Sequence, residues 1–193
     1  MGRPSLSEQR TREILEAFMR CVARQGLGGT SMQDIADEAG MKRPILRHYV
    51  GNRAELVSAL AEYVADQYRA QLDAWIGALP TEGRLDALLK AFFPRTPASE
   101  ADEILVLESL IAAAPDDETI RAPILAFVNH ALSAIEQLVA AEAPQASKAE
   151  RRAVAYGILS VWWNHSSLTP LRTPRSHRQA ALDAARLLID ALS

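Results

Sequence analysis

The stretch Thr30–Tyr49, TSMQDIADEAGMKRPILRHY, predicts two short helices joined by a tight turn. Its first segment places Ile35, Ala36 and Ala39 on one side. Gly40 then interrupts the pattern, and glycine ends helices in the left-handed conformation without a Cβ penalty. Two short amphipathic segments around such a turn are typical of a helix-turn-helix.

The ends of both segments carry local signals. Ser31 precedes Asp34 by three residues, so its hydroxyl is expected to cap the first helix. Pro44 is tolerated only in the first turn of a helix, which predicts that the second helix starts at about Lys42 or Arg43. After this start, Arg47, His48 and Tyr49 are able to face outward together with Arg43.

Charge separates the chain into two parts. Residues 1–53 hold nine Lys or Arg against six Asp or Glu, whereas residues 54–193 hold twelve against eighteen. The first part is therefore basic although the whole chain has a net charge of −3. Basic charge beside a helix-turn-helix favours nucleic-acid binding. We expect a helix-turn-helix DNA-binding domain at 1–53, termed the reading head, and a helical domain at 54–193, to which the family resemblance given below assigns ligand binding and dimerisation.

Helical spacing continues along the chain, without a convincing strand. The first helix is expected over about 7–25, packed through Ile14, Leu15, Phe18, Cys21 and Val22. Asn52 and Glu55 stand at capping-box spacing and begin a long helix toward Pro80. Later helices are expected at 82–93, 99–114, 116–142, 147–168 and 174–192, with a kink or break at Pro123. The prediction is an all-α fold with a three-helix head and a helical C-terminal domain.

Several classes are disfavoured. Cys21 is the single cysteine, so an internal disulfide is impossible and a small core residue is expected. No uninterrupted apolar run approaches 18 residues and no apolar leader is present, which predicts no membrane span and a cytoplasmic protein. The histidines lie in different segments without carboxylate or cysteine partners at ligand spacing, namely His48, His130, His165 and His177. We therefore expect no enzyme, metal or cofactor, and a small helical enzyme remains a weaker alternative.

The chain from Thr11 to about Leu60 resembles the TetR family of bacterial transcriptional regulators. The matching features, in order, are an amphipathic first helix, the Gly26–Gly29 turn, Thr30-Ser31, Asp34-Ile35-Ala36, Ala39-Gly40, a recognition helix, Asn52-Arg53 and Leu56. The sequence departs from the common pattern at Arg47, where the family usually has Tyr, and at Arg53, where it usually has Lys.

The resemblance implies a homodimeric repressor that binds a palindromic double-stranded DNA operator and is released by a small molecule. Base contacts are expected from Lys42, Arg43, Ile45, Arg47 and His48, and phosphate contacts from Thr30, Ser31, Tyr49 and Arg53. Arg3 lies either in a disordered start or in an arm that reaches the minor groove.

The last two helices have apolar faces that a small monomer covers with difficulty. The resemblance implies that they pair with a second copy in a four-helix bundle. The expected interface is Ala153, Tyr156, Ser160, Trp163, Ser167, Ala181, Ala184, Ala185, Leu188 and Leu192. A second face of the first of these helices comprises Val154, Ile158, Val161, Trp162 and His165. Ordinary packing within one chain is the alternative.

The resemblance also implies an effector pocket in the body. Its expected lining is Trp75, Phe92, Phe93, Leu107, Phe127, Trp162 and His165, which suits a largely apolar molecule. The same residues are equally able to form plain core. The protein would then be a regulator with a filled core, controlled by a protein partner or by no ligand.

Overall fold

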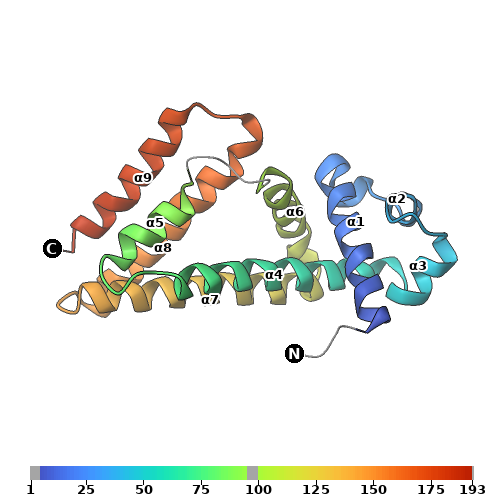
Figure 1. Ribbon diagram of the computed structural model, residues 1–193, viewed down its shortest axis with the longest axis horizontal. Helices are drawn as coiled ribbons and strands as arrows, with labels where there is room; N and C mark the ends of the chain where they lie inside the picture. The colour runs from blue at the N-terminus through green and yellow to red at the C-terminus, as the bar shows by residue number, and fades with distance from the viewer. Residues whose placement is uncertain (1–4, 95–99, 193) are drawn as a thin grey trace. The chain divides into compact units, whose positions relative to one another are not determined.

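Every regular element in the described part of the chain is a helix. The computed structural model describes residues 5–94 and 100–192. In chain order the elements are α1 (Leu6–Gly29), α2 (Met32–Glu38), α3 (Arg43–Val50), α4 (Arg53–Gly77), α5 (Arg84–Phe92), α6 (Glu100–Ala113), η1 (Ala114–Asp116), α7 (Glu118–Glu142), α8 (Lys148–Ser167), η2 (Thr169–Leu171) and α9 (Arg175–Asp190) (Figure 1). The predicted all-α fold is confirmed, whereas the predicted arm residue Arg3 lies outside the described residues.

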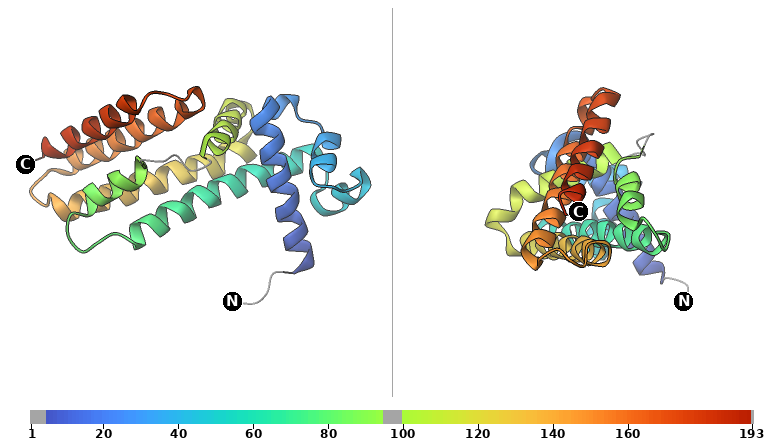
Figure 2. Two further views of the ribbon diagram at one scale, coloured as in Figure 1. Left: turned by 45° about the horizontal axis from the view of Figure 1, so that its top comes forward. Right: turned by 90° about the vertical axis from the view of Figure 1, so that its left-hand side faces the viewer.

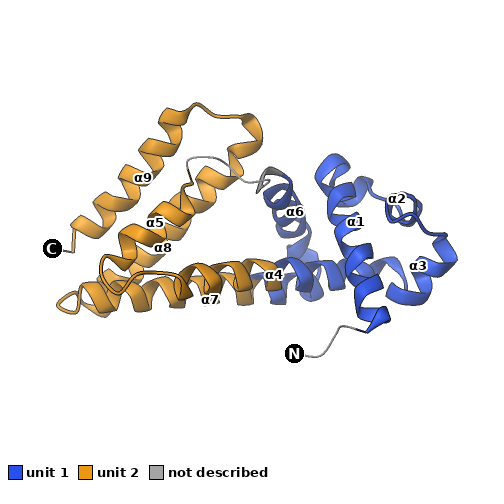
Figure 3. Ribbon diagram, viewed as in Figure 1, with its two compact units in different colours: residues 1–65, 102–124 blue, residues 66–101, 125–193 orange. Residues whose placement is uncertain are grey.

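The chain forms two compact units. Unit 1 comprises residues 1–65 and 102–124, and unit 2 comprises residues 66–101 and 125–193 (Figure 3). Two of the three boundaries fall inside the long helices α4 and α7, so each of these helices contributes one part to each unit, and the third boundary falls near the start of α6. The predicted boundary between residues 53 and 54 was drawn between a DNA-binding role and a ligand-binding and dimerisation role, and it does not coincide with a boundary between these compact units. That division of roles stays a prediction.

Unit 1 is organised around the apolar face of α1. Ile14, Phe18 and Cys21 are fully buried there, as the helical spacing predicts. The helix is interrupted at Gly26, whose φ of 74° and ψ of 164° lie outside the helical region. Only glycine adopts this conformation without a steric cost, so Gly26 turns the chain toward α2. The three residues after it are again helical, so α1 runs to Gly29 with a kink at Gly26.

Unit 2 contains an antiparallel pair, α8 and α9, which lie side by side in each view (Figures 1 and 2). The two helices approach closely at Gly157, because a Cβ built there would lie 2.7 Å from Cδ1 of Leu188. Ile158 and Ala185 are fully buried on the facing sides. Burial of a large aliphatic side chain contributes about 1.5–3 kcal/mol, so Ile158 in this seam contributes to the stability of unit 2.

The long helix α7 continues through Pro123, so of the expected kink or break the break does not occur, and the kink stays a prediction. Its buried residues, among them Phe127, Ala131 and Ile135, recur at helical spacing. By length and composition alone α7 is able to cross a membrane, with a mean hydropathy of 1.5 over its most apolar window. A third of that window is buried inside the protein, and core helices of soluble proteins have the same composition.

Candidate nucleic-acid interface

The first helix of the helix-turn-helix begins at a complete capping box. The Ser31 hydroxyl accepts a hydrogen bond from the Asp34 amide at 3.2 Å, and the Ser31 amide donates to the Asp34 carboxylate at 2.8 Å. Hydrogen bonds from the Ser31 hydroxyl and amide hold the pKa of Asp34 below its ordinary value. The predicted cap is confirmed. The Asp34 carboxylate accepts a hydrogen bond within the head, from the Ser31 amide.

The turn after α2 is a Schellman motif. Gly40 has a φ of 64°, its amide donates to the Asp37 carbonyl at 3.1 Å, and the Met41 amide donates to the Ala36 carbonyl at 2.9 Å. These two bonds satisfy carbonyls at the end of α2 that would otherwise lack partners. The predicted role of Gly40 is therefore confirmed, and the turn has a fixed geometry.

The recognition helix α3 presents its cations to solvent. Leu46 is fully buried and anchors the helix, while Pro44 occupies its first turn as predicted. Lys42, Arg43 and Arg47 are exposed and have no ion pair with any described residue. No Asp or Glu occurs between Ala39 and Ala54. The outer side of α3 is therefore an exposed basic surface, and it also carries Ile45, which is 48% exposed.

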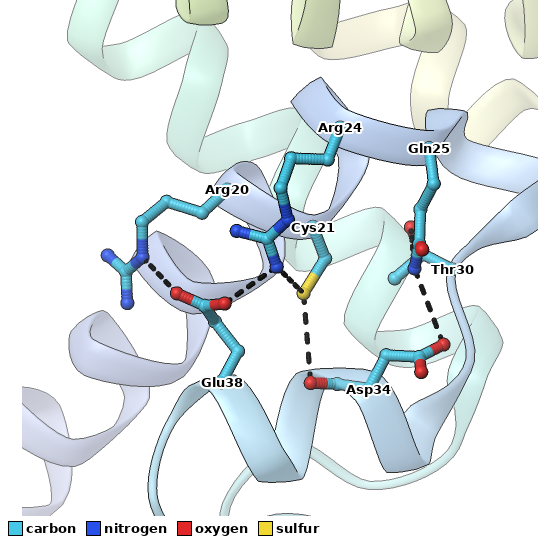
Figure 4. A network of polar contacts seen from close by, with 7 residues as sticks. All are labelled: Arg20, Cys21, Arg24, Gln25, Thr30, Asp34 and Glu38. Carbon is cyan, nitrogen blue, oxygen red and sulfur yellow. Dashed lines mark hydrogen bonds and ion pairs between the residues drawn. The ribbon is translucent and has the colours of Figure 1, made fainter.

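The acidic residue nearest to this surface is neutralised within the head. Glu38, the last residue of α2, accepts hydrogen bonds at 2.6 Å from both Arg20 and Arg24 of α1 (Figure 4). These bonds hold the pKa of Glu38 below its ordinary value. The buried Cys21 thiol lies beside them, with Sγ 3.7 Å from the Asp34 carbonyl oxygen (Figure 4). The polar network joins α1 to α2 and keeps Glu38 from opposing the charge of α3.

The turn from α3 to α4 is equally constrained. Gly51 has a φ of 71°, and a Cβ built on it would lie 2.0 Å from Oε2 of Glu55. Asn52 and Glu55 form the predicted reciprocal cap, with bonds of 2.7 and 3.1 Å. The end of α3 and the start of α4 are thereby fixed to each other.

Two of the predicted phosphate contacts are engaged inside unit 1. Thr30 is 2% exposed, and its hydroxyl donates to the Gly26 carbonyl at 2.9 Å. Both terminal nitrogens of Arg53 donate to backbone carbonyls, those of Thr30 and Leu27. The expected phosphate role is disfavoured for both side chains, because burial and these bonds depend on neighbours that sequence spacing does not reveal. Ser31 is exposed, and Tyr49 is half-buried with its ring against His48.

The predicted effector residues divide between the units. In unit 2, the Phe92 ring contacts two tryptophan rings. Its centroid lies 5.6 Å from that of Trp75 and 5.7 Å from that of Trp162. Phe127 belongs to the same unit, and so do Phe93 and His165, whose rings lie 5.4 Å apart. Burial lowers the pKa of His165 below its ordinary value. Leu107 is fully buried in unit 1.

Sequence reasoning missed Tyr68, whose ring centroid lies 5.2 Å from Phe127 and 6.2 Å from Trp162. Its position one turn before Leu72 on α4 was the available signal. We refer to Tyr68, Trp75, Phe92, Phe127 and Trp162 as the aromatic cluster. A groove of about 830 Å³ lies elsewhere in unit 2, between α7 and α8, and none of the predicted effector residues lines it.

The predicted dimer residues are only partly exposed. On α8, Ala153, Tyr156 and Ser160 face outward, while the second face turns Val154, Ile158 and Trp162 inward. On α9, Ala185 is fully buried within the chain, which disfavours a contact with a second copy. Leu188 contacts the chain's own Gly157 region, whereas Leu187, which the sequence analysis omitted, is 69% exposed.

His130 has a carboxylate partner that the sequence spacing did not predict. Its Nε2 lies 2.7 Å from the Asp73 carboxylate on α4, although the two residues are distant in sequence. The described residues contain no group of three His, Cys, Asp or Glu side chains placed to hold a metal ion.

The fold and the exposed basic helix define a DNA-binding protein of the helix-turn-helix class. Residues 14–60 match the family model described as "Bacterial regulatory proteins, tetR family". Over this segment the chain is similar to the TetR family of transcriptional regulators, which confirms the resemblance seen in the sequence.

Individual relatives agree with this assignment. The chain is 33% identical over 85 residues to the HTH-type transcriptional regulator PksA of Bacillus subtilis, covering 43% of this chain and 42% of PksA. It is 26% identical over 125 residues to the HTH-type transcriptional regulator BetI of Burkholderia ambifaria, covering 65% and 54%. The chain thus spans about half the length of the curated relatives it matches.

Solved structures share the fold over nearly the whole chain. A TetR transcription regulator from Haloarcula marismortui is 18% identical with a TM-score of 0.78, covering 95% of this chain and 97% of that one. The multidrug binding protein EbrR, complexed with imidazole, is 19% identical with a TM-score of 0.64 and 96% of each chain covered. At these identities the likeness concerns the fold alone.

Proposed function

We propose that this protein is a homodimeric repressor that binds a palindromic operator through α3 and is released by a small, largely apolar effector. The observation that carries the proposal is the exposed, acid-free surface of α3. A DNA-reading helix needs cations that approach phosphate and base edges, together with a rigid support. The unpaired cations of α3 and the fixed turns on either side of it meet both needs.

Each exposed residue of α3 has a chemically matched target. Arg43 is proposed to take a guanine edge with two hydrogen bonds, and Ile45 to contact a thymine methyl group. Lys42, Arg47 and His48 complete the base-reading set. Ser31 is proposed to contact phosphate because it is exposed at the start of α2, and Tyr49 supplies a second phosphate contact.

A dimer follows from the limited reach of one helix. One short helix reads only a few base pairs, so two heads give a two-fold symmetric site with half-sites about one helical turn apart. The outward residues of α8 and α9 in unit 2, including Tyr156 and Leu187, supply an apolar face for a second copy.

The decisive experiment selects DNA with the purified full chain. A randomised duplex library is carried through rounds of binding at low salt, and the enriched sequence is then titrated. We expect a two-fold symmetric sequence, bound more tightly than a scrambled duplex by a factor of about 10³ or more. Arg47→Ala is expected to weaken binding, whereas the matched control Arg69→Ala, outside the reading head, is not. An absence of enrichment at low salt would end the proposal.

For the effector, the aromatic cluster is the supporting feature, because apolar walls with few polar groups suit an apolar molecule. The fold of EbrR, whose name describes multidrug binding, gives further support. The test is a thermal-shift screen with a panel of apolar aromatic compounds, followed by tryptophan fluorescence that reports on Trp75 and Trp162. A positive compound should raise the melting temperature and lower operator affinity.

The alternative is a regulator whose core is already filled. It is favoured by the close ring packing in the cluster, where Phe92 is only 4% exposed and Phe127 only 2%. If no compound in the panel shifts the melting temperature while DNA selection succeeds, control by a protein partner or by no ligand is the better description.

A further inference from the structure

Arg53, the first residue of α4, holds two carbonyls of the segment between α1 and α2. Its Nη2 donates to the Leu27 carbonyl at 2.6 Å, and its Nη1 donates to the Thr30 carbonyl. The two contacts join residues 26 and 23 positions apart in sequence, all of them within unit 1. The guanidinium therefore links the start of α4 to the entry of α2.

Two amides that follow these carbonyls in the chain already donate to other acceptors. The Gly26 break takes Leu27 out of the regular ladder of α1. Beyond it, the Ser31 amide donates to the Asp34 carboxylate, and the Asp34 amide donates to the Ser31 hydroxyl. Thr30 is 2% exposed, so water has little access to replace the guanidinium there. Leaving a buried carbonyl unpaired is costly, so the Arg53 bonds have a structural value.

The shape of the side chain matters as well as its charge. A guanidinium presents several N–H groups in one rigid plane and can bind two acceptors at a fixed separation. A lysine ammonium is a single point on a flexible stem. The backbone of Arg53 is also fixed, because the Asn52–Glu55 cap and Gly51 constrain the first turn of α4.

The geometry points to Arg53 as a positioning residue of the reading head: its guanidinium clamps the entry of α2 to the first turn of α4, and through α2 it orients α3 for DNA, instead of binding phosphate itself. This inference rests on the proposed function. It replaces the phosphate contact expected for Arg53 from the sequence.

Salt dependence distinguishes the two roles. A residue that neutralises a phosphate contributes about 0.9 to the slope of log affinity against log salt, because it releases a counterion. A dimer carries two copies of each contact, so its slope falls by about twice that amount when one residue is lost per chain. A positioning residue changes affinity and leaves the slope almost unchanged.

The experiment titrates wild type, Arg53→Lys, Arg53→Ala and the matched control Arg47→Ala on the selected operator at several salt concentrations. Thermal melts followed by circular dichroism identify a temperature at which every variant is folded, and the titrations are run at that temperature. We expect Arg53→Lys to bind about tenfold more weakly with an unchanged slope, since one ammonium cannot replace the planar fork. Arg47→Ala should reduce the slope, because it removes an exposed cation from the surface proposed to face the DNA, where a base-reading arginine also lies close to phosphates and displaces counterions.

Three outcomes would overturn the inference. If Arg53→Lys binds with wild-type affinity, the residue contacts phosphate, where lysine is an adequate replacement. If Arg53→Ala has a reduced slope of log affinity against log salt, the residue also contacts phosphate. A lower melting temperature with unchanged affinity of the folded protein assigns it to stability alone. If Arg53→Ala does not fold, Arg53→Lys alone decides. Failure of the wild type to bind any selected duplex concerns the proposed function and is seen before any variant is made.

Discussion

The Nη2 atom of Arg24 on α1 lies 2.6 Å from Oε2 of Glu38, the last residue of α2. The other carboxylate oxygen of Glu38 takes a contact of equal length from Arg20. One acid therefore holds two cations on α1, and its negative charge is balanced within the head. The link serves both the packing of the head and its electrostatics.

Glu38→Gln is expected to destabilise the protein at neutral pH. The pKa of Glu38 in the folded protein is lowered below its ordinary value of 4.5 by hydrogen bonds from Arg20 and Arg24. The stabilisation is therefore fully present above the ordinary pKa and is lost as the pH falls through the lowered value. Urea melts of both proteins across this range should show a difference at pH 7 that shrinks in acid. A constant difference would contradict the assignment.

Gly51→Ala is expected to cost about 1–3 kcal/mol of stability, from left-handed strain together with loss of the Asn52–Glu55 cap. The new Cβ would displace the Glu55 carboxylate, since it would lie 2.0 Å from Oε2. Chemical denaturation provides the measurement. Gly77→Ala is the control, because a Cβ there meets nothing within 4 Å, and it should be neutral or slightly stabilising.

Arg43→Ala is expected to relax base preference at one position in each half-site, by about 1–3 kcal/mol of discrimination. The reason is the loss of a bidentate contact while the phosphate contacts remain. Titrations on the matched operator and on duplexes substituted at each position would locate the effect. Arg10→Ala serves as the control, because Arg10 lies on α1 and is paired with Glu13. A uniform loss of affinity across all duplexes would reassign Arg43 to the DNA backbone.

The double substitution Tyr156→Glu and Leu187→Glu is expected to weaken dimerisation at least about a hundredfold, because carboxylates would be buried without partners. Both side chains are mostly exposed in the single chain, at 65% and 69%. Analytical ultracentrifugation over a concentration series measures the change. Leu171→Glu is a matched control at a 72% exposed position in η2. Sedimentation of the double variant as a wild-type dimer would show that the interface lies on another surface.

Local signals in the sequence were sufficient for the reading head. The deciding residues act through hydrogen bonds or steric limits within a few positions, so short sequence patterns predict their effects. These residues are Ser31, Gly40, Pro44 and Asn52. The same reasoning located the ends of the later helices near Pro115 and Ser147. At Pro123 it left a kink and a break open, and the structure excludes the break because α7 continues to Glu142.

The sequence by itself determined which segments are helices, where the helix-turn-helix lies and that α3 carries unopposed positive charge, because these properties depend on neighbours within about one helical turn. Only the tertiary structure decided which face of α8 is buried, that Ala185 and Thr30 lie inside, and that Arg53 holds two carbonyls more than twenty residues away. Burial and long-range hydrogen bonds depend on which elements meet in space, and the spacing of residues along one helix does not contain that information.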